Sequence, residues 1–374
     1  MRLAGSALVV LLAGSACGGP GPANLRPSPT ASAVASATQS PTPSFQSSPE
    51  PTATATPTAT LPLVPLGFSC RLPIFRPFSG SANPPPVVGF WSLPDGGLSF
   101  APVPAYPKQG GGGDKPYGFY YDRAFSRWLP APRTAVSPDG KHYAYMLRGE
   151  ALVADKDVLH IVDVATSRDH SYPAVPAGST PERYTVLDYA SEGIYLGLAY
   201  EGPIWGLSMM DPNTGVIRKV ADLGYLYAID GSAVWLGSVN PADPNPQLGL
   251  GVQPDSIDRF DLVTGVRTTW LYLPGMAVWV VAEDLAGHPI VEAGSSVSGD
   301  AELLLLTGPG TAQPILKGVA AQLGVPSPST GFGGPIADGH GVWFGSANGI
   351  YLYSSTGGFQ KVSDLGFYPG NGCI

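Results

Sequence analysis

Short motifs for known chemistries are absent from this chain. It contains no Gly-x-Ser-x-Gly elbow, no His-Glu-x-x-His pair and no Cys-x-x-Cys pair, and no two of its five histidines have the spacing of a metal-ligand pair. We therefore predict no metal site and no cofactor. A Ser or Asp nucleophile assembled from distant parts of the chain stays open.

Charged residues are also scarce, at 13% of the 374 residues. Removing Arg2, Arg26 and Glu50, the only charged residues before position 63, leaves 18 basic and 27 acidic residues and a net charge of −9. An acidic surface argues against binding to nucleic acid or to anionic membranes. Low charge together with 49 glycines is typical of many short strands joined by tight turns.

Long apolar runs are missing except at the N-terminus. Residues 1–17, MRLAGSALVVLLAGSAC, combine a basic start, an apolar run and small residues before Cys17. The run is too short for a membrane-spanning helix and resembles a bacterial lipoprotein signal, which implies that Cys17 carries a lipid. The tripeptide at 14–16 also suits ordinary signal cleavage and secretion. Either way, we expect the mature chain to work outside the cytoplasm.

Residues 18–62 are rich in Pro, Ser, Thr and Ala and have almost no large apolar side chains. Such a segment cannot bury enough surface to offset its ordering entropy, so it is predicted to be a disordered stalk. The stalk would separate the cell membrane from a single folded domain over 63–374, which we expect to be monomeric and to meet the membrane only through the N-terminal lipid.

The folded part is organised around a unit of four short strands, seen most clearly at 333–365. Runs rich in β-branched and aromatic residues at 334–337, 341–346, 350–354 and 359–365 are separated by Asp-Gly, Asn-Gly and Thr-Gly-Gly turns. One sheet of this size cannot cover both of its faces, so copies of the unit should stack against each other.

Two kinds of turn recur along the chain and set the number of copies. The Asp-x-x-Thr-Gly turn and its weaker versions start at 122, 163, 211, 261, 307 and 354, at intervals of 41 to 50 residues. An acidic residue followed by Gly recurs near 95, 139, 192, 230, 284 and 338. Both series predict an all-β fold, a β-propeller with six blades of four antiparallel strands. Seven blades are the alternative, with 63–87 contributing a partial one.

Blade motifs support this architecture. Residues 137–141 read Ser-Pro-Asp-Gly-Lys, and in this run the chain resembles TolB-type and WD40-like propeller repeats. The run from Asp338 through Val342-Trp343-Phe344-Gly345-Ser346 resembles propeller repeats of two-component regulators. Trp235 and Trp343 occupy equivalent places and are predicted to be core. Blade one is expected over 87–132, after a Pro-rich segment at 71–87 that crosses the base of the ring.

Besides Cys17, the only cysteines are Cys70, at the start of the folded part, and Cys373. A closed ring places the two chain ends beside each other, and an oxidising compartment permits a bridge. We therefore predict a Cys70–Cys373 disulfide. Two buried free thiols are the alternative.

Loop lengths predict a binding face. The connections between second and third strands are long, at 104–116, 148–157, 240–256 and 295–300, and the inter-blade segments 177–183 and 318–330 should join them on one face. Variable loops on a rigid ring commonly carry function, although long loops can also be tolerated insertions. The candidate binding residues on these loops are Tyr106, Asp114, Glu150, Asp155, Arg183, Asp243 and Asp255.

Two functions fit these observations. The favoured one is a lipid-anchored, non-catalytic propeller that binds a protein, a peptide or an envelope polymer through its long-loop face. The alternative is a secreted propeller enzyme, such as a metal-dependent lactonase or a cyclotransferase, with carboxylates at the channel mouth. Asp188 and Asp284 lie near innermost strands and either offer such carboxylates to a cation or cap turns.

Overall fold

The folded part of the chain consists almost entirely of short antiparallel strands. The computed structural model describes residues 61–76, 85–105, 118–147, 157–174, 183–199, 204–239, 253–294, 301–319, 323 and 334–374. Residues 56–374 form one compact unit. The predicted signal peptide with Cys17, and the stalk up to residue 60, lie outside the described residues. Within the described part, no helix is long and apolar enough to cross a bilayer.

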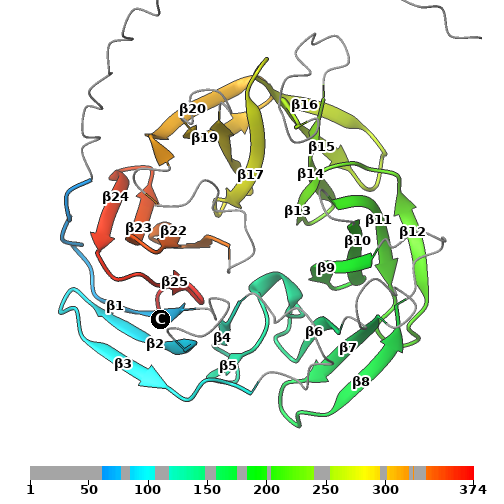
Figure 1. Ribbon diagram of the computed structural model, residues 1–374, viewed down its shortest axis with the longest axis horizontal. Helices are drawn as coiled ribbons and strands as arrows, with labels where there is room; N and C mark the ends of the chain where they lie inside the picture. Colours follow the sequence, from blue (N-terminus) through cyan, green and yellow to red (C-terminus); the bar gives the residue numbers. More distant parts are fainter. Residues whose placement is uncertain are drawn as a thin grey trace, which may run out of the picture. The chain divides into compact units, whose positions relative to one another are not determined.

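Six blades follow one another around a ring, which confirms the predicted β-propeller (Figure 1). Blades three to six are each built from four consecutive strands. They comprise β9(Arg183–Ala190), β10(Gly193–Ala199), β11(Ile204–Met210) and β12(Ile217–Ala221); β13(Leu226–Asp230), β14(Ala233–Ser238), β15(Ser256–Asp261) and β16(Arg267–Tyr272); β17(Ala277–Glu283), β18(Pro289–Gly294), β19(Ala301–Gly308) and β20(Thr311–Lys317); β21(Ile336–Asp338), β22(Gly341–Ser346), β23(Gly349–Ser354) and β24(Gly358–Ser363).

Blade two has a shortened innermost strand. Its sheet contains β6(His142–Leu147), β7(Val158–Asp163) and β8(Asp169–Pro173). The 3-10 turn η1(Arg133–Ala135) leads into Val136, which forms an isolated antiparallel bridge to Tyr143 of β6. Val136 therefore takes the place of the innermost strand of blade two, next to β6.

Blade one combines both ends of the folded chain, which differs from our prediction. Its order is β25(Tyr368–Pro369), β1(Cys70–Arg76), β2(Val87–Leu93) and β3(Leu98–Ala101). The segment expected to cross the base of the ring therefore contains a strand. Pro73 has no N–H to give to a ladder, but its carbonyl accepts a hydrogen bond of 2.8 Å from Gly370 N, so the strand tolerates it.

The two strands expected to complete blade one form a separate hairpin. β4(Tyr120–Asp122) and β5(Arg127–Leu129) pair only with each other. Apolar clusters join the hairpin to blade one through Phe75 and to blade two through Val162. Tyr121 N also donates to Gly370 O at 2.9 Å. The C-terminal segment thus bonds to β1 on one side and to β4 on the other, which closes the ring.

The predicted disulfide is confirmed at this closure. Cys70 and Cys373 are bonded, with their Cα atoms 5.5 Å apart across a separation of 303 residues. Beside them, Arg71 N donates to Ile374 O at 3.1 Å, and Ile374 N donates to Arg71 O at 3.0 Å. The chain-entropy model sets a ceiling of about 5 kcal/mol on the stabilisation from so long a loop.

The core lies between neighbouring blades, because each sheet buries both of its faces. In β18 of blade five, Val291 packs in the cluster with Trp235 of blade four, and Ile290 packs in the cluster with Phe344 of blade six. Trp235 and Trp343 are 1% and 0% exposed, as their equivalent places predicted. Alternating side chains on each strand therefore account for the stacking of blades.

The Asp-x-x-Thr-Gly turns that revealed the repeat join third and fourth strands. In each, the Asp carboxylate accepts hydrogen bonds from the Thr hydroxyl and from backbone N–H groups of the turn, and these bonds lower the pKa of the carboxyl. The pairs are Asp163 with Thr166, Asp211 with Thr214, and Asp261 with Thr264. The repeat signal thus comes from turn formers and not from site residues.

Candidate functional site

A cavity of about 500 Å³ lies at one end of the inner strands of blades two, three and four. The polar residues of its wall include Arg133, Asp188, Ser191, Glu192 and Ser232. Residues 191–192 and 231–232 are the turns between the first and second strands of blades three and four. In antiparallel blades these turns lie at the opposite end from the second-to-third loops. The cavity is therefore on the tight-turn face and not on the predicted long-loop face.

A β-bulge places Asp188 at this end of blade three. The register between β9 and β10 passes from Val186↔Leu196 to Asp188↔Tyr195, which leaves Leu187 as the extra residue. A bulge reorients the side chains that follow it. Burial raises the pKa of Asp188 to about 6, and the Tyr189 backbone N–H and the field of Arg133 only partly offset this effect.

Glu192 supplies a second carboxylate to the cavity wall. Burial alone would raise its pKa, but hydrogen bonds from Tyr195, at 2.8 Å, from the backbone, and from Ser191, at 3.0 Å, outweigh burial and lower it. Glu192 and Asp188 are therefore both mainly ionised at neutral pH.

Arg133 brings the opposite charge to the same cavity. Its guanidinium lies over the Tyr120 ring, 5.5 Å from the centroid. Within the described residues it has no carboxylate within 4.0 Å. The wall thus presents a guanidinium and two carboxylates that are not consumed in a tight ion pair with each other.

Further carboxylates lie on the neighbouring inner strands. Glu283 ends β17, and burial followed by the fields of Asp230, Asp188 and Asp284 raises its pKa to about 8, although the nearby Trp235 indole N–H lowers it. No group of three or more metal-binding side chains is present in the part of the chain that the structure describes. The carboxylates therefore make an acidic environment and not a recognisable ion cage.

Asp284 has the turn-capping role that we weighed against cation binding. Its Oδ1 accepts hydrogen bonds from Ala286 N at 2.8 Å and His288 N at 2.9 Å, and its Oδ2 lies 3.1 Å from His288 Nδ1. The contacts fix the turn into β18, so Asp284 differs from Asp188, which lines the cavity.

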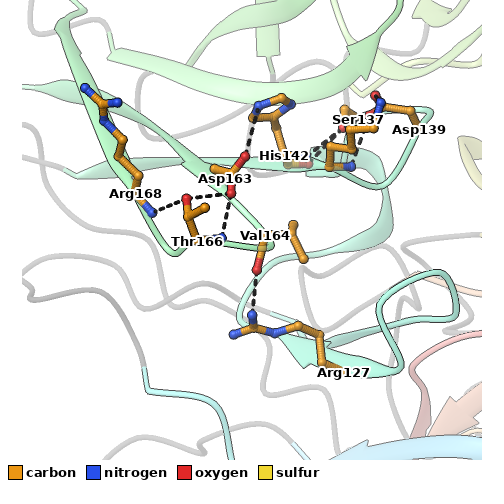
Figure 2. Close-up of polar contacts among 9 residues, drawn as sticks. Arg127, Ser137, Asp139, His142, Asp163, Val164, Thr166 and Arg168 are labelled. Atoms are coloured by element: carbon orange, nitrogen blue, oxygen red, sulfur yellow. Dashed lines mark hydrogen bonds and ion pairs between the residues drawn. The ribbon is translucent and has the colours of Figure 1, made fainter.

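The Ser-Pro-Asp-Gly-Lys motif of blade two is also structural (Figure 2). Asp139 Oδ1 accepts hydrogen bonds from Lys141 N at 3.0 Å and Ser137 Oγ at 2.8 Å, and these bonds lower the pKa of Asp139 to about 2. Ser137 Oγ accepts a further bond of 2.9 Å from His142 N. The motif that carries the propeller resemblance therefore shapes a turn.

The structure describes only two of the seven predicted binding-face residues. Tyr106, Asp114, Glu150, Asp155 and Asp243 lie outside the described residues. Arg183 begins β9, where its Nη1 is 3.6 Å from Asp157 Oδ1, and its side chain is 12% exposed. Asp255 precedes β15, is 5% exposed and accepts a hydrogen bond of 3.1 Å from Ser256 Oγ. Both stand at the predicted long-loop end of their blades.

Sequence reasoning missed Arg133, Glu192 and Glu283 as site residues. Glu192 resembled any other turn acid, and Arg133 precedes a strand too short to recognise. The one available signal was Asp188, a carboxylate inside an otherwise apolar inner strand. Only the stacking of consecutive blades brings these residues together.

Known proteins resemble this chain in fold only distantly. No family model matches it, and no curated protein is significantly similar. TolB from Acinetobacter baumannii is 13% identical, with a TM-score of 0.45 over 78% of this chain and 62% of that one. The periplasmic gluconolactonase PpgL of Pseudomonas aeruginosa is 11% identical, with a TM-score of 0.40 over 79% and 82% of the two chains. An oligogalacturonate lyase solved with manganese is 13% identical, with a TM-score of 0.41 over 82% and 86%.

The chain spans less than two thirds of the length of TolB, and 40% of the length of a prolyl endopeptidase that is 11% identical with a TM-score of 0.44. These similarities concern the fold alone. The strand order and the closure described above identify the protein as a β-propeller.

Proposed function

We propose that this protein is a non-catalytic propeller that binds a protein, a peptide or an envelope polymer outside the cytoplasm, anchored to the cell membrane through a lipid on Cys17. The observation that carries the proposal is the cavity of about 500 Å³ on the tight-turn face. Its volume is that of a typical ligand site, and it combines charges of both signs with apolar wall residues. The disulfide is consistent with an oxidising compartment.

The binding face is the part of this proposal that needs a direct test. The loops predicted to form the long-loop face lie largely outside the described residues. The long-loop face therefore stays a second candidate binding face, in addition to the cavity. A pull-down from envelope extracts with the full chain would compare three variants. Ser232→Trp fills the cavity, a shortened 240–252 loop alters the long-loop face, and Val263→Trp adds the same bulk at an 82% exposed residue of another tight turn.

We expect Ser232→Trp to lose the captured partner, while the other two variants retain it. Loss with the shortened loop and retention with Ser232→Trp would move the binding site to the long-loop face. Thermal unfolding of each variant provides the control for folding.

The enzyme alternative draws on a separate observation, the two inner-strand carboxylates whose pKa values are raised, Asp188 and Glu283. Glu283, whose pKa of about 8 keeps it mainly protonated near neutral pH, can act as a general acid, and the mainly ionised Asp188 can act as a general base. Turnover of a lactone by the wild-type chain, abolished in Asp188→Asn, would favour this alternative over the binding function.

A further inference from the structure

The cavity is bipolar, and that property points to the chemistry of its ligand. Arg133 enters it from the short turn before the inner strand of blade two. Asp188 and Glu192 enter from the inner strand of blade three and the turn that follows it. Positive and negative groups therefore come from two different blades and face one shared volume.

Among the described residues, no oppositely charged side chain lies within 4.0 Å of Arg133, Asp188 or Glu192. The field of Arg133 nevertheless lowers the pKa of Asp188. Glu192 is held by Tyr195 and Ser191, which are neutral donors that orient the carboxylate and leave its charge in place. A ligand with one positive and one negative group satisfies both walls, whereas a purely anionic or purely cationic ligand satisfies one and meets like charge on the other.

The remaining surfaces limit the size and character of the ligand. Val136, Pro138 and Ala190 supply apolar wall, and Ser191 and Ser232 supply hydroxyls that donate and accept. A volume of about 500 Å³ accommodates a few residues, such as the end of a partner's chain, and not a whole folded domain. The cavity is therefore suited to the end of a chain, or to a short peptide, with its charges close together.

We propose that this cavity binds a compact zwitterionic peptide unit, with the ligand's ammonium against Asp188 and Glu192 and its carboxylate against Arg133. The inference rests on the proposed binding function and specifies the ligand class for the cavity. It assigns recognition to charge pairing across blades two and three and not to a metal.

The test is calorimetric titration of the full chain with alanyl-alanine in four forms: both ends free, N-acetylated, C-amidated, and blocked at both ends. We expect the free dipeptide to bind most tightly and each block to weaken binding by about 10-fold or more, since a charge-assisted hydrogen bond contributes that much. Equal affinity for the free and doubly blocked dipeptides, or no binding by any form, would overturn the proposal.

Variants of Asp188 and Arg133 test which side of the cavity binds each charged end of the ligand. In Asp188→Asn, where Glu192 remains, acetylation of the ligand should cost less affinity than it does in the wild type, while amidation should still cost its full factor. In Arg133→Gln the pattern should reverse, and Arg133→Lys should restore part of the dependence on the ligand's carboxylate. Variants in which both dependences keep their wild-type size would also overturn the assignment.

The four ligand forms are compared on the wild-type chain, so the test stands even if a variant fails to fold. The pull-down is a separate readout of the proposed function. A captured partner lost in Ser232→Trp, together with no discrimination among the dipeptides, would remove this ligand class and keep the binding function. Dipeptide binding with no captured partner would keep this ligand class and remove the support for an envelope partner.

Discussion

Blades four and six place the same two residues at the same positions and use them differently. Asp230 and Asp338 each end an inner strand, paired with Ala233 and Gly341 at the start of the second strand. A tryptophan follows five residues later in both blades. In blade six, Trp343 Nε1 donates to Asp338 Oδ2 at 2.8 Å. In blade four, the carboxylate of Asp230 takes no hydrogen bond within the described residues.

The difference follows from what lies beside each blade. Asp338 faces the ring closure, where its Oδ2 also accepts a bond of 2.7 Å from Cys373 N and its Oδ1 accepts one of 2.8 Å from His340 N. Trp235 of blade four instead lies near Glu283 of blade five, and its Nε1 is buried without a well-formed hydrogen bond in the described part of the chain. The same repeat position thus supports the ring closure in blade six, through Asp338, whereas in blade four Asp230 has no hydrogen-bond partner among the described residues.

Removing the two carboxylates should separate these roles most clearly. We expect Asp338→Ala to lower the free energy of unfolding by about 3 kcal/mol, because it removes the acceptor of Trp343 Nε1, on a fully buried side chain, and of Cys373 N, which is partly buried. Asp230→Ala should change it by less than about 0.5 kcal/mol, since it removes a charge that opposes ionisation of Glu283. Urea unfolding of both variants measures the difference. Equal losses would show that the blades are energetically equivalent.

Much of this fold can be predicted from the sequence because its turns are local. Asp163 and Thr166 reveal their turn wherever the blade stands, and Cys70 and Cys373 bracket the ring. Blade one could not be predicted, since β1 pairs with β25 from the other end of the chain. The roles of Asp230 and Asp338 are equally hidden, because they depend on the next blade and not on the adjacent sequence.

Two buried acidic residues, Asp258 and Glu292, differ in the same way in their hydrogen bonding. Asp258 of β15 is 3% exposed and is bonded to Ser238 and Arg267. Glu292 of β18 is 1% exposed, and its Oε2 has no partner among the described residues. Burial raises the pKa of Glu292 from 4.5 to about 8. The folded state therefore holds the Glu292 proton more tightly than the unfolded chain does.

The stabilisation from this proton should be complete below about pH 4.5 and lost as the pH rises through about 8. We expect Glu292→Gln to remove this dependence and to exceed the wild type in unfolding free energy by roughly 2 kcal/mol at pH 9. Urea unfolding at pH 5, 7 and 9 checks it, with Glu302→Gln on the adjacent strand as the control. A wild-type profile that is flat from pH 5 to 9 would contradict the prediction.

The smallest expected change in stability concerns the contact between the Asp230 carboxylate and Gly287 of blade five. Gly287, in the turn of blade five, has φ +76°, and a Cβ built there would lie 2.9 Å from Asp230 Oδ2. Gly265 has a similar φ of +70° and open space around it. Both substitutions to Ala carry the cost of a left-handed backbone, but only Gly287→Ala must also displace the carboxylate.

We therefore expect Gly287→Ala to destabilise the protein by about 1 kcal/mol more than Gly265→Ala. In an Asp230→Ala background that excess should vanish, because the obstructing oxygen is gone. Thermal unfolding of the four single and double variants measures this coupling. If the excess persists without the carboxylate, backbone strain at Gly287 accounts for it, and the Asp230 carboxylate does not obstruct a side chain at Gly287 of blade five.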